Sequence, residues 1–329
     1  MKNSYALALG AIAATFTIQG AFAADFTMRI SHQYPPSHQV AKALEQFAAD
    51  VESGSSGKVD VQVFGSEQLF KATQNHAAVA RGEVEAAAIV SFQWGGTIPE
   101  MNVTSIPYLM TSVDKLTKFA GSDASKLLDE KMASKGIRNI AWLIDANDGL
   151  FTSAKAPLIT PGDFKGVKIR GLSKLLDHGL KAMGAAPSAM PGSEVYQALQ
   201  TGVIDASVTG VAAGYSRRLY EVQKYGVASA FAAVYANLVV NPAWWDKLPA
   251  DVQASIEAAA RQAEKRLLPA SDGVSQKDVA NLREKGMEVV VLTPEQEKVL
   301  TDAMQEAVIK AFIDSAPDGA KLVEIVKGL

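Results

Sequence analysis

Arg170 is the residue whose type and position most clearly predict chemistry in this chain. It ends a short apolar run within GVKIRG, Val167 to Arg170, where a strand is expected. Ligands of open α/β sheets bind where strands end, and a guanidinium presents a planar fork of donors that matches a carboxylate. The alternative is a surface salt bridge at a strand end, which contributes little to stability. We therefore predict that Arg170 binds the carboxylate of a small ligand.

Polar and aromatic side chains near the other predicted strand ends are further candidate ligand contacts. These candidates are His32, Gln33, Glu67, Phe92, Gln93, Trp94, Thr209 and Tyr215. Thr209 offers a hydroxyl, and Glu67 stands at the opening of a predicted helix, whose N-terminal amides attract anionic or hydroxylated groups. The structural alternatives are a packed histidine at His32, a first-turn acid at Glu67 and a core tryptophan at Trp94.

The sequence contains no recognisable constellation for covalent or metal catalysis. Cysteine is absent, the 4 histidines are dispersed, and the motifs Gly-x-Ser-x-Gly, His-Glu-x-x-His and Gly-x-Gly-x-x-Gly do not occur. Ser-x-x-Lys occurs at Ser55 and Ser112, but neither Ser-Asp-Asn nor Lys-Thr-Gly accompanies it. We expect no cofactor, no metal ion and no enzyme activity. A periplasmic enzyme acting on organic acids stays open as an alternative.

The first residues have the order of a secretory signal. Lys2 precedes an apolar run from Ala6 to about Ile18, and Ala21-Phe22-Ala23 supplies small residues for cleavage. We predict cleavage after about Ala23 and export to the periplasm. The apolar run is shorter than the roughly 20 residues that span a bilayer, so we expect no stable membrane insertion.

Length, apolar content and charge limit the remaining function classes. A chain of 329 residues with 48% hydrophobic residues can form about two domains with ample cores, and it must do so without disulfides. The formal net charge is −3, and no basic cluster is longer than Arg217-Arg218. Nucleic acid is therefore an unfavourable partner, because phosphate binding needs a concentrated positive face. We expect a monomer.

Short apolar runs alternate with helical patterns and predict a layered α/β protein. The predicted strands are Phe26 to Ile30, Val59 to Phe64, Glu85 to Val90, Ile140 to Ile144, Val167 to Arg170 and Ala206 to Val208. The predicted helices are Val40 to Val51, Glu67 to Arg81, Asp114 to Lys135, Ser173 to Met183 and Ser193 to Gln200. From Pro249 to about Glu284 the pattern is helical again, with a bend or break at Pro269.

A weak internal repeat predicts two lobes built on one plan. VARGEVEA, which contains Gly82, and LQTGVIDA, which contains Gly202, share a helix end, a glycine, an apolar residue, an acid and an alanine. Each glycine can supply the left-handed conformation that ends a helix and leads into a strand. Ligand would then bind between the lobes, although such turns also occur in any α/β protein.

The stretch from Gly166 to Tyr225 resembles the extracytoplasmic solute receptors of TRAP (tripartite ATP-independent periplasmic) transporters, the DctP-like family. KIR, SEVYQALQTGVIDA and YEVQKY carry the likeness, and SHQYPPSHQVAKALEQ and VVNPAWWDKLPADVQ extend it over the mature chain. In that family the arginine of the KIR strand binds the substrate carboxylate, which implies this role for Arg170. The resemblance also implies TRAP membrane subunits as partners, and a sensor role beside a histidine kinase stays open.

The resemblance implies a two-lobe periplasmic-binding-protein fold with a long helix crossing both lobes. A final strand is expected at Met287 to Leu292, followed by a last helix from Pro294 with Thr293 as its cap. The expected division is residues 1–23 as signal peptide, 24–147 plus 237–275 as lobe I, and 148–236 plus 276–329 as lobe II.

Two departures from the family pattern affect the expected ligand. Thr209-Gly210 stands where members commonly have Asn-Pro, and Gly149 falls where many carry a second ligand arginine. One charged clamp is therefore expected, and Glu67 would repel a second carboxylate. We favour a monocarboxylate bearing several hydroxyls, such as a uronate or another sugar acid. An aromatic carboxylate, a dicarboxylate and an osmolyte stay open.

Overall fold

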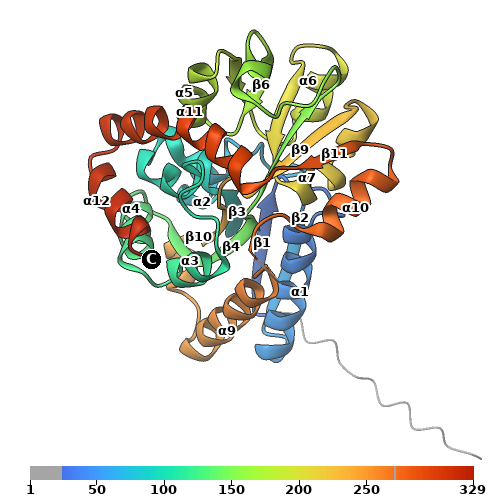
Figure 1. Cartoon of the computed structure of the whole chain (residues 1–329). Coiled ribbons are helices and arrows are strands. Elements are labelled where there is room, and N and C mark those ends of the chain that lie inside the picture. Colours follow the sequence, from blue (N-terminus) through green and yellow to red (C-terminus); the bar gives the residue numbers. More distant parts are fainter. Residues whose placement is uncertain (1–23, 270–271) are drawn as a thin grey trace, which may run out of the picture.

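Two β-sheets, each covered by helices, form the body of the protein (Figure 1). The computed structural model describes residues 24–269 and 272–329, so the predicted signal segment lies outside the described residues. The first sheet has five strands in the order β2-β1-β3-β10-β4, and the second has six in the order β11-β9-β5-β8-β6-β7. The α/β class and the two lobes predicted from the sequence are confirmed.

The first sheet consists of β1 (Phe26–His32), β2 (Val59–Phe64), β3 (Ala86–Val90), β4 (Arg138–Ala146) and β10 (Val234–Val240). The second consists of β5 (Gly149–Ser153), β6 (Lys168–Gly171), β7 (Ala186–Ala189), β8 (Ala206–Thr209), β9 (Tyr225–Ser229) and β11 (Glu288–Val291). The α-helices are α1 (Gln39–Gly54), α2 (Asn75–Ala80), α3 (Val113–Phe119), α4 (Asp123–Ala133), α5 (Lys174–Ala182), α6 (Val195–Gln200), α7 (Val211–Ser216), α8 (Pro242–Trp245), α9 (Ala250–Arg266), α10 (Gln276–Glu284), α11 (Pro294–Ser315) and α12 (Gly319–Lys327). Short 3-10 segments are η1 (Ser91–Gly96), η2 (Pro99–Ser105), η3 (Pro161–Phe164) and η4 (Leu219–Glu221).

The two sheets share one topology. In the first, β1 pairs in parallel with β2 and β3, and β10 lies antiparallel between β3 and β4. In the second, β6 pairs in parallel with β7 and β8, and β5 lies antiparallel between β8 and β9. The chain passes between the sheets at the β4–β5, β9–β10 and β10–β11 connections. Such an arrangement brings the carboxyl ends of β1 and β3 opposite those of β6 and β8.

The repeat seen in the sequence marks equivalent places in the two lobes. Gly82 lies between α2 and β3 with φ +72°, and Gly202 lies between α6 and β8 with φ +73°. Both glycines therefore adopt the left-handed conformation that was predicted for them.

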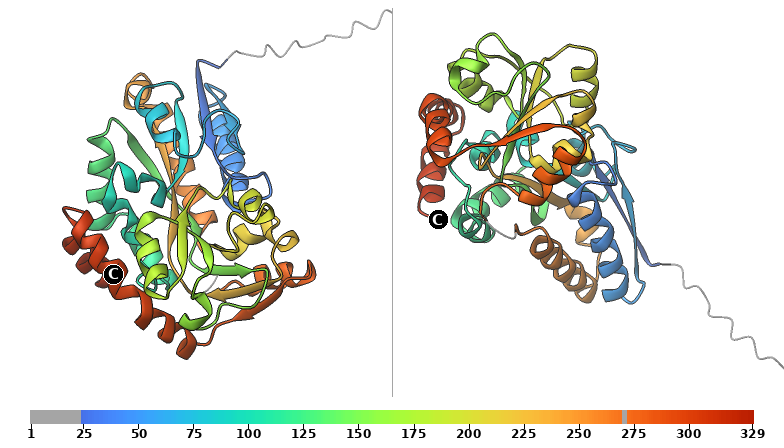
Figure 2. Two further views of the ribbon diagram at one scale, coloured as in Figure 1. Left: turned by 90° about the horizontal axis from the view of Figure 1, so that it is seen from above. Right: turned by 45° about the vertical axis from the view of Figure 1, so that its right-hand side comes forward.

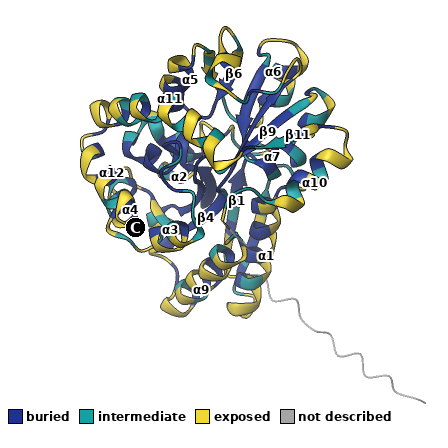
Figure 3. Ribbon diagram, in the orientation of Figure 1, coloured by how far each residue is buried: buried dark blue, intermediate teal, exposed yellow. Residues whose placement is uncertain are grey.

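Buried side chains line the strands and the inner helix faces, while the outer helix faces are exposed (Figure 3). α1 and α9 pack side by side on the first sheet, as the two views of Figure 2 show. Phe231, between β9 and β10, packs edge-on against Phe151 of β5 and against Tyr108, with ring centroids 5.0 and 5.4 Å apart. The hydrophobic core is thus continuous from one lobe to the other.

Two predicted helices differ in the structure. The segment predicted as helix from Glu67 is helical only from Asn75 to Ala80, and Ser66 and Glu67 have φ of +52° and +62°. The amides of these two residues donate to the carbonyls of Tyr34 and His32, which holds them in a left-handed turn beside β1. The second difference is that the region from 114 to 135 forms α3 and α4 separately, because the intervening Gly121 has φ +89°.

The helical pattern from Pro249 to about Glu284, where the resemblance suggested a long helix crossing both lobes, is interrupted near Pro269, as predicted. α9 ends at Arg266 before Pro269, which cannot donate a helical amide bond, and α10 begins only at Gln276. α11 instead packs against α5, and its Gln305 donates to the carbonyl of Pro107 near η2. The cap that Thr293 was predicted to provide for this last helix is confirmed, and so is the strand before it.

In the two ranges that the structure describes, no helix is both long and apolar enough to cross a bilayer.

Candidate functional site

A narrow cavity between the lobes collects side chains from the strand ends of both sheets. Its polar and aromatic lining residues are Gln33, Phe92, Asp145, Arg170, Thr209 and Arg217. Four of these, Gln33, Phe92, Arg170 and Thr209, are candidates from the sequence. The cavity measures about 20 Å³, room for about one water molecule, so an organic acid can enter only when the lobes separate.

Arg170 is almost fully buried at the end of β6, with 1% of its surface exposed. Its Nε and Nη2 both donate to the carbonyl of Met190 at 3.0 Å, and its Nη1 donates to the carbonyl of Val208 at 2.6 Å. Burial, followed by the charge of Arg217, lowers the pKa of Arg170 to about 9. Within the described residues, the guanidinium of Arg170 donates only to uncharged backbone carbonyls. Its positive charge is therefore available to an anion.

Arg217 is a second guanidinium in the narrow cavity, and reasoning from the sequence missed it. It follows α7, and its Nη1 donates to Thr209 Oγ1 at 3.3 Å. Its Nε is buried without a hydrogen-bond partner in the described part of the chain. Burial lowers the pKa of Arg217, and the charge of Asp145 opposes that shift. The sequence showed this residue only as part of the Arg217-Arg218 pair.

Position 149, where many family members carry a second ligand arginine, has no room for a side chain in this structure. It begins β5 directly against Phe231, and a Cβ on residue 149 would lie 2.6 Å from the Cβ of Phe231. Any side chain there would displace the aromatic contact that joins the lobes. Arg217, which follows α7, places a positive charge in the narrow cavity, whereas position 149 has no room for a side chain.

Asp145 completes the charged lining of the narrow cavity. Tyr34 Oη donates to its Oδ2 at 3.0 Å, and His38 Nε2 lies 3.4 Å from its Oδ1. Burial raises the pKa of Asp145, while Arg217, Tyr34 and Arg170 favour its charged form. Asp145 directly follows the predicted strand ending at Ile144, so the strand-end rule that singled out Arg170 would also have identified it.

Gln93 lines a wider cavity that adjoins the narrow one across Phe92 and Leu172. This wider cavity measures about 400 Å³ and also includes Lys174 and His178 of α5. The Nε2 of Gln93 is buried without a hydrogen-bond partner among the residues described. The two cavities together mark the interlobe cleft.

The other aromatic and histidine candidates lie outside both cavities. His32 is buried, its Nδ1 accepts a hydrogen bond from the Tyr34 amide at 3.1 Å, and burial lowers its pKa to about 4. Trp94 has no exposed surface, and its ring lies 5.7 Å from that of His76. Tyr215 packs against Tyr220 with ring centroids 5.9 Å apart. In this closed arrangement these side chains pack rather than line the cleft.

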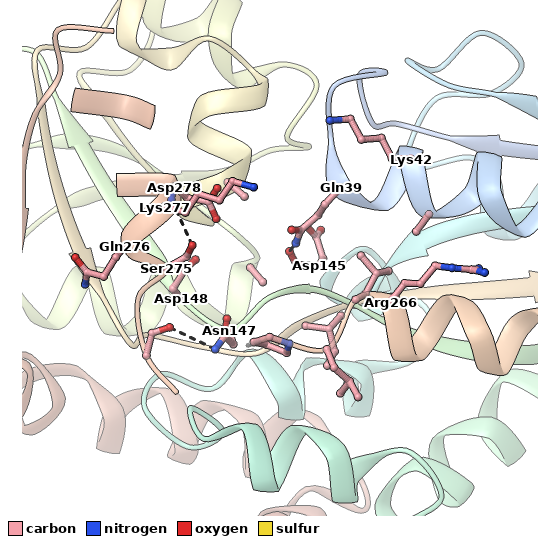
Figure 4. A pocket seen from close by; sticks show the side chains of 18 of the residues that line it. Gln39, Lys42, Asp145, Asn147, Asp148, Arg266, Ser275, Gln276, Lys277 and Asp278 are labelled. Atoms are coloured by element: carbon pink, nitrogen blue, oxygen red, sulfur yellow. Dashed lines mark hydrogen bonds between the residues drawn. The ribbon is translucent and has the colours of Figure 1, made fainter. Parts of the chain in front are cut away.

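A third and larger hollow, of about 730 Å³, lies beside the β4–β5 connection (Figure 4). Gln39 and Lys42 of α1 stand on one side, and the start of α10 at Gln276 on the other. Asp148 accepts the Val211 amide at 2.9 Å, and burial raises the pKa of its carboxyl to about 6. The hollow is thus part of the region where the chain passes between the lobes.

Glu67 makes a contact between the lobes instead of lining the narrow cavity. Its Oε1 accepts hydrogen bonds from Ser193 Oγ at 2.8 Å and from the Ala72 amide at 2.9 Å. Lys71 lies 3.3 Å from its Oε2. Ser193 precedes α6 of the second lobe, so its bond to Glu67 forms only when the lobes are together.

Ser193→Ala should weaken ligand affinity about fivefold, mainly by speeding ligand dissociation. A hydrogen bond to a charged group is worth about 1 kcal/mol or somewhat more, and this one stabilises the closed form alone. Stopped-flow measurement of dissociation tests the expectation. Lys71→Met is the matched control, because Lys71 contacts the same carboxylate from within the first lobe. Equal effects of the two variants would rule out a role in closure.

Comparison with protein families gives one match that covers most of the chain. The model of "Bacterial extracellular solute-binding protein, family 7", named DctP, matches residues 30–315. This range includes every strand except the first part of β1, and every residue of the narrow cavity.

Individual proteins of known name show the same relationship. The C4-dicarboxylate-binding periplasmic protein DctP of Rhodobacter capsulatus is 34% identical over 73% of this chain and 72% of its own length. The 2,3-diketo-L-gulonate-binding periplasmic protein YiaO of Escherichia coli is 28% identical over 98% of this chain and 97% of its own. A TRAP periplasmic solute-binding protein from Sulfurospirillum deleyianum, solved with bound succinate, superposes with a TM-score of 0.84 at 26% identity, covering 92% of this chain and 99% of the other.

Proposed function

The chain belongs to bacterial extracellular solute-binding protein family 7, and from this premise we propose that its ligand is a monocarboxylate bearing several hydroxyl groups, such as a uronate or another sugar acid. The protein is a periplasmic solute receptor of the TRAP type, which binds a small organic acid and works with membrane subunits. It is a transport receptor and not an enzyme.

The charge of the narrow cavity is the observation that carries the proposal. Among the lining residues, Arg170 and Arg217 contribute two positive charges and Asp145 one negative charge, so the lining itself carries one excess positive charge. Asp177 also interacts with Arg170 but does not line the cavity. An uncompensated charge in a closed cleft is costly, and one ligand carboxylate would neutralise it. Arg170 is the partner best suited to that carboxylate because the hydrogen bonds described for it go to backbone carbonyls only.

The uncharged groups of the cleft favour hydroxyls on the same ligand. Gln33 Oε1 is a buried acceptor and Gln93 Nε2 a buried donor, and neither has a hydrogen-bond partner in the described residues. Buried polar groups are normally paired, and a hydroxyl can serve as either donor or acceptor. The Escherichia coli relative is named for a sugar acid, 2,3-diketo-L-gulonate, which is in keeping with this class.

A C4 dicarboxylate is the second candidate. The Rhodobacter capsulatus relative is named for C4 dicarboxylates, the Sulfurospirillum deleyianum structure holds succinate, and this cavity has two arginines. The candidate requires the second carboxylate to lie near the negative charge of Asp145, which disfavours it.

We also propose three further properties of the protein: the lobe boundaries given above, a monomeric state and the absence of a nucleic-acid partner.

A thermal-shift screen decides between these ligand classes. The panel should include uronates, aldonates, C4 dicarboxylates, benzoate-type acids and ectoine-like osmolytes, with calorimetry on each acid that responds. A ligand present at 100 times its dissociation constant stabilises the protein by about 2.7 kcal/mol. We expect the largest shift with a sugar acid. A shift with succinate or malate and none with any sugar acid would overturn the ligand proposal and leave the receptor function standing.

A further inference from the structure

We infer that Asp145 determines which acids the cleft accepts: its carboxylate excludes a second ligand carboxylate and takes a hydrogen bond from a ligand hydroxyl or N–H group. The inference deepens the proposed function, because it rests on an acid binding beside Arg170. Neither the sequence reasoning nor the family resemblance assigned a role to Asp145.

Asp145 lines the narrow cavity and also borders the larger hollow of Figure 4, so its charge adjoins the place where we propose that the ligand binds. It belongs to β4 of the first lobe, while Arg170 and Arg217 come from the second, and all three line the narrow cavity. Only 8% of its surface is exposed. A ligand carboxylate held by Arg170 would therefore have its other end facing Asp145 when the lobes close.

The carboxylate of Asp145 is held in place from its own lobe. Tyr34 Oη donates to Oδ2 at 3.0 Å, and His38 Nε2 lies 3.4 Å from Oδ1. The His38 ring is itself fixed, because its Nδ1 accepts the Val40 amide at 3.2 Å and its face stacks on Tyr34 with ring centroids 4.5 Å apart. Since Nδ1 is an acceptor, the proton of the neutral ring is on Nε2, which lies near Asp145 but makes no hydrogen bond within the described residues.

This arrangement leaves acceptor capacity on Asp145 that faces the ligand. Each carboxylate oxygen can accept two hydrogen bonds, and each has one donor or close imidazole nitrogen from the first lobe. A hydroxyl or N–H group of the ligand can use the remaining capacity, whereas a second carboxylate brings a like charge and no donor. Glu67, which the sequence suggested for this repulsion, instead bonds to Ser193, so Asp145 is the acid that can exert it.

Asp145→Asn tests the inference because it removes the charge and keeps the size of the side chain. Calorimetry of the full-length mature receptor would compare succinate, malate, D-glucuronate and D-galacturonate on wild type and variant. We expect the ratio of uronate affinity to succinate affinity to fall at least about a hundredfold, through gain of succinate and loss of uronate. Asp148→Asn is the matched control, because Asp148 is equally buried just after β4 and does not line the narrow cavity.

The outcomes separate this inference from the proposed function. If the wild type binds a uronate and Asp145→Asn leaves the ratio of uronate to succinate affinity unchanged, the inference alone is overturned. Tight binding of succinate by the wild type would overturn both the inference and the ligand proposal. A wild type that binds only an N–H-bearing acid such as pyroglutamate overturns the sugar-acid proposal, and loss of that binding in Asp145→Asn supports the inference. If Asp145→Asn does not fold, Tyr34→Phe serves instead. It removes a donor and keeps the charge, so it should weaken uronate binding and still reject succinate; succinate binding by this variant would count against the inference.

Discussion

Arg170→Ala should weaken ligand binding by at least a factor of about one hundred. The ligand carboxylate would be buried beside Asp145 without its main charged partner, at a cost of about 3 kcal/mol or more, which corresponds to roughly a hundredfold in Kd. Arg170→Lys should also bind poorly, because an ammonium cannot reproduce two parallel hydrogen bonds. Isothermal calorimetry with the acid found in the thermal-shift screen measures both variants.

Controls must separate an effect on ligand binding from an effect on stability, because Arg170 also donates hydrogen bonds to the protein backbone. The alanine variant leaves the carbonyls of Met190 and Val208 without the donors they have now. The temperature of thermal unfolding without ligand should therefore fall by only a few degrees, since three hydrogen bonds from the guanidinium to two backbone carbonyls are lost. Lys168→Ala, on the exposed start of the same strand, is the matched control and should bind normally. Near-native affinity of Arg170→Ala would remove the residue from the site.

Local patterns were sufficient to place most of the fold. The six strands predicted from apolar runs all exist within a few residues of their predicted ends, because each run buries apolar side chains in the core. The left-handed conformations of Gly82 and Gly202 could be predicted equally well, since a left-handed position between a helix and a strand favours glycine in any context. The rule that ligands bind at strand ends then predicted Arg170 as a cleft residue, although the sequence does not tell which strands are neighbours.

Features set by contacts between distant segments could not be predicted in this way. Glu67 opens a segment with helical composition, but hydrogen bonds to the loop after β1 override that preference. β10 reads as apolar from Val234 to Val240, yet its place between β3 and β4 depends on the chain returning from the other lobe. Propensity is a weak guide wherever tertiary partners supply the hydrogen bonds.

Asp145 and Arg217, the two charged residues of the narrow cavity besides Arg170, differ in whether the sequence alone could identify them. Asp145 follows the predicted strand that ends at Ile144 and lies near the end of β4, so a consistent use of the strand-end rule identifies it. Arg217 lies a full helix beyond the strand end at Thr209, and its neighbour Arg218 is exposed and paired with Glu221. Only the three-dimensional path of α7 tells which of the two arginines enters the cleft.

Arg217→Gln should lower ligand affinity by about ten- to a hundredfold, and the loss should depend on Asp145. Without Arg217 the charges of Arg170 and Asp145 cancel, so the cavity no longer favours an anion. Arg218→Gln is the matched control and should bind normally, because its side chain is 68% exposed and bonds to Glu221. Calorimetry with the same acid measures each variant.

The double variant Asp145→Asn/Arg217→Gln completes the argument about charge. It leaves Arg170 as the single charge among these three residues and so restores the excess of one positive charge present in the wild type. Residues that share one network show non-additive effects, and the double variant should therefore bind no more weakly than Arg217→Gln alone. A double variant whose loss equals the product of the two single losses would mean that the residues act independently. Charge balance between Arg217 and Asp145 would then not govern ligand choice.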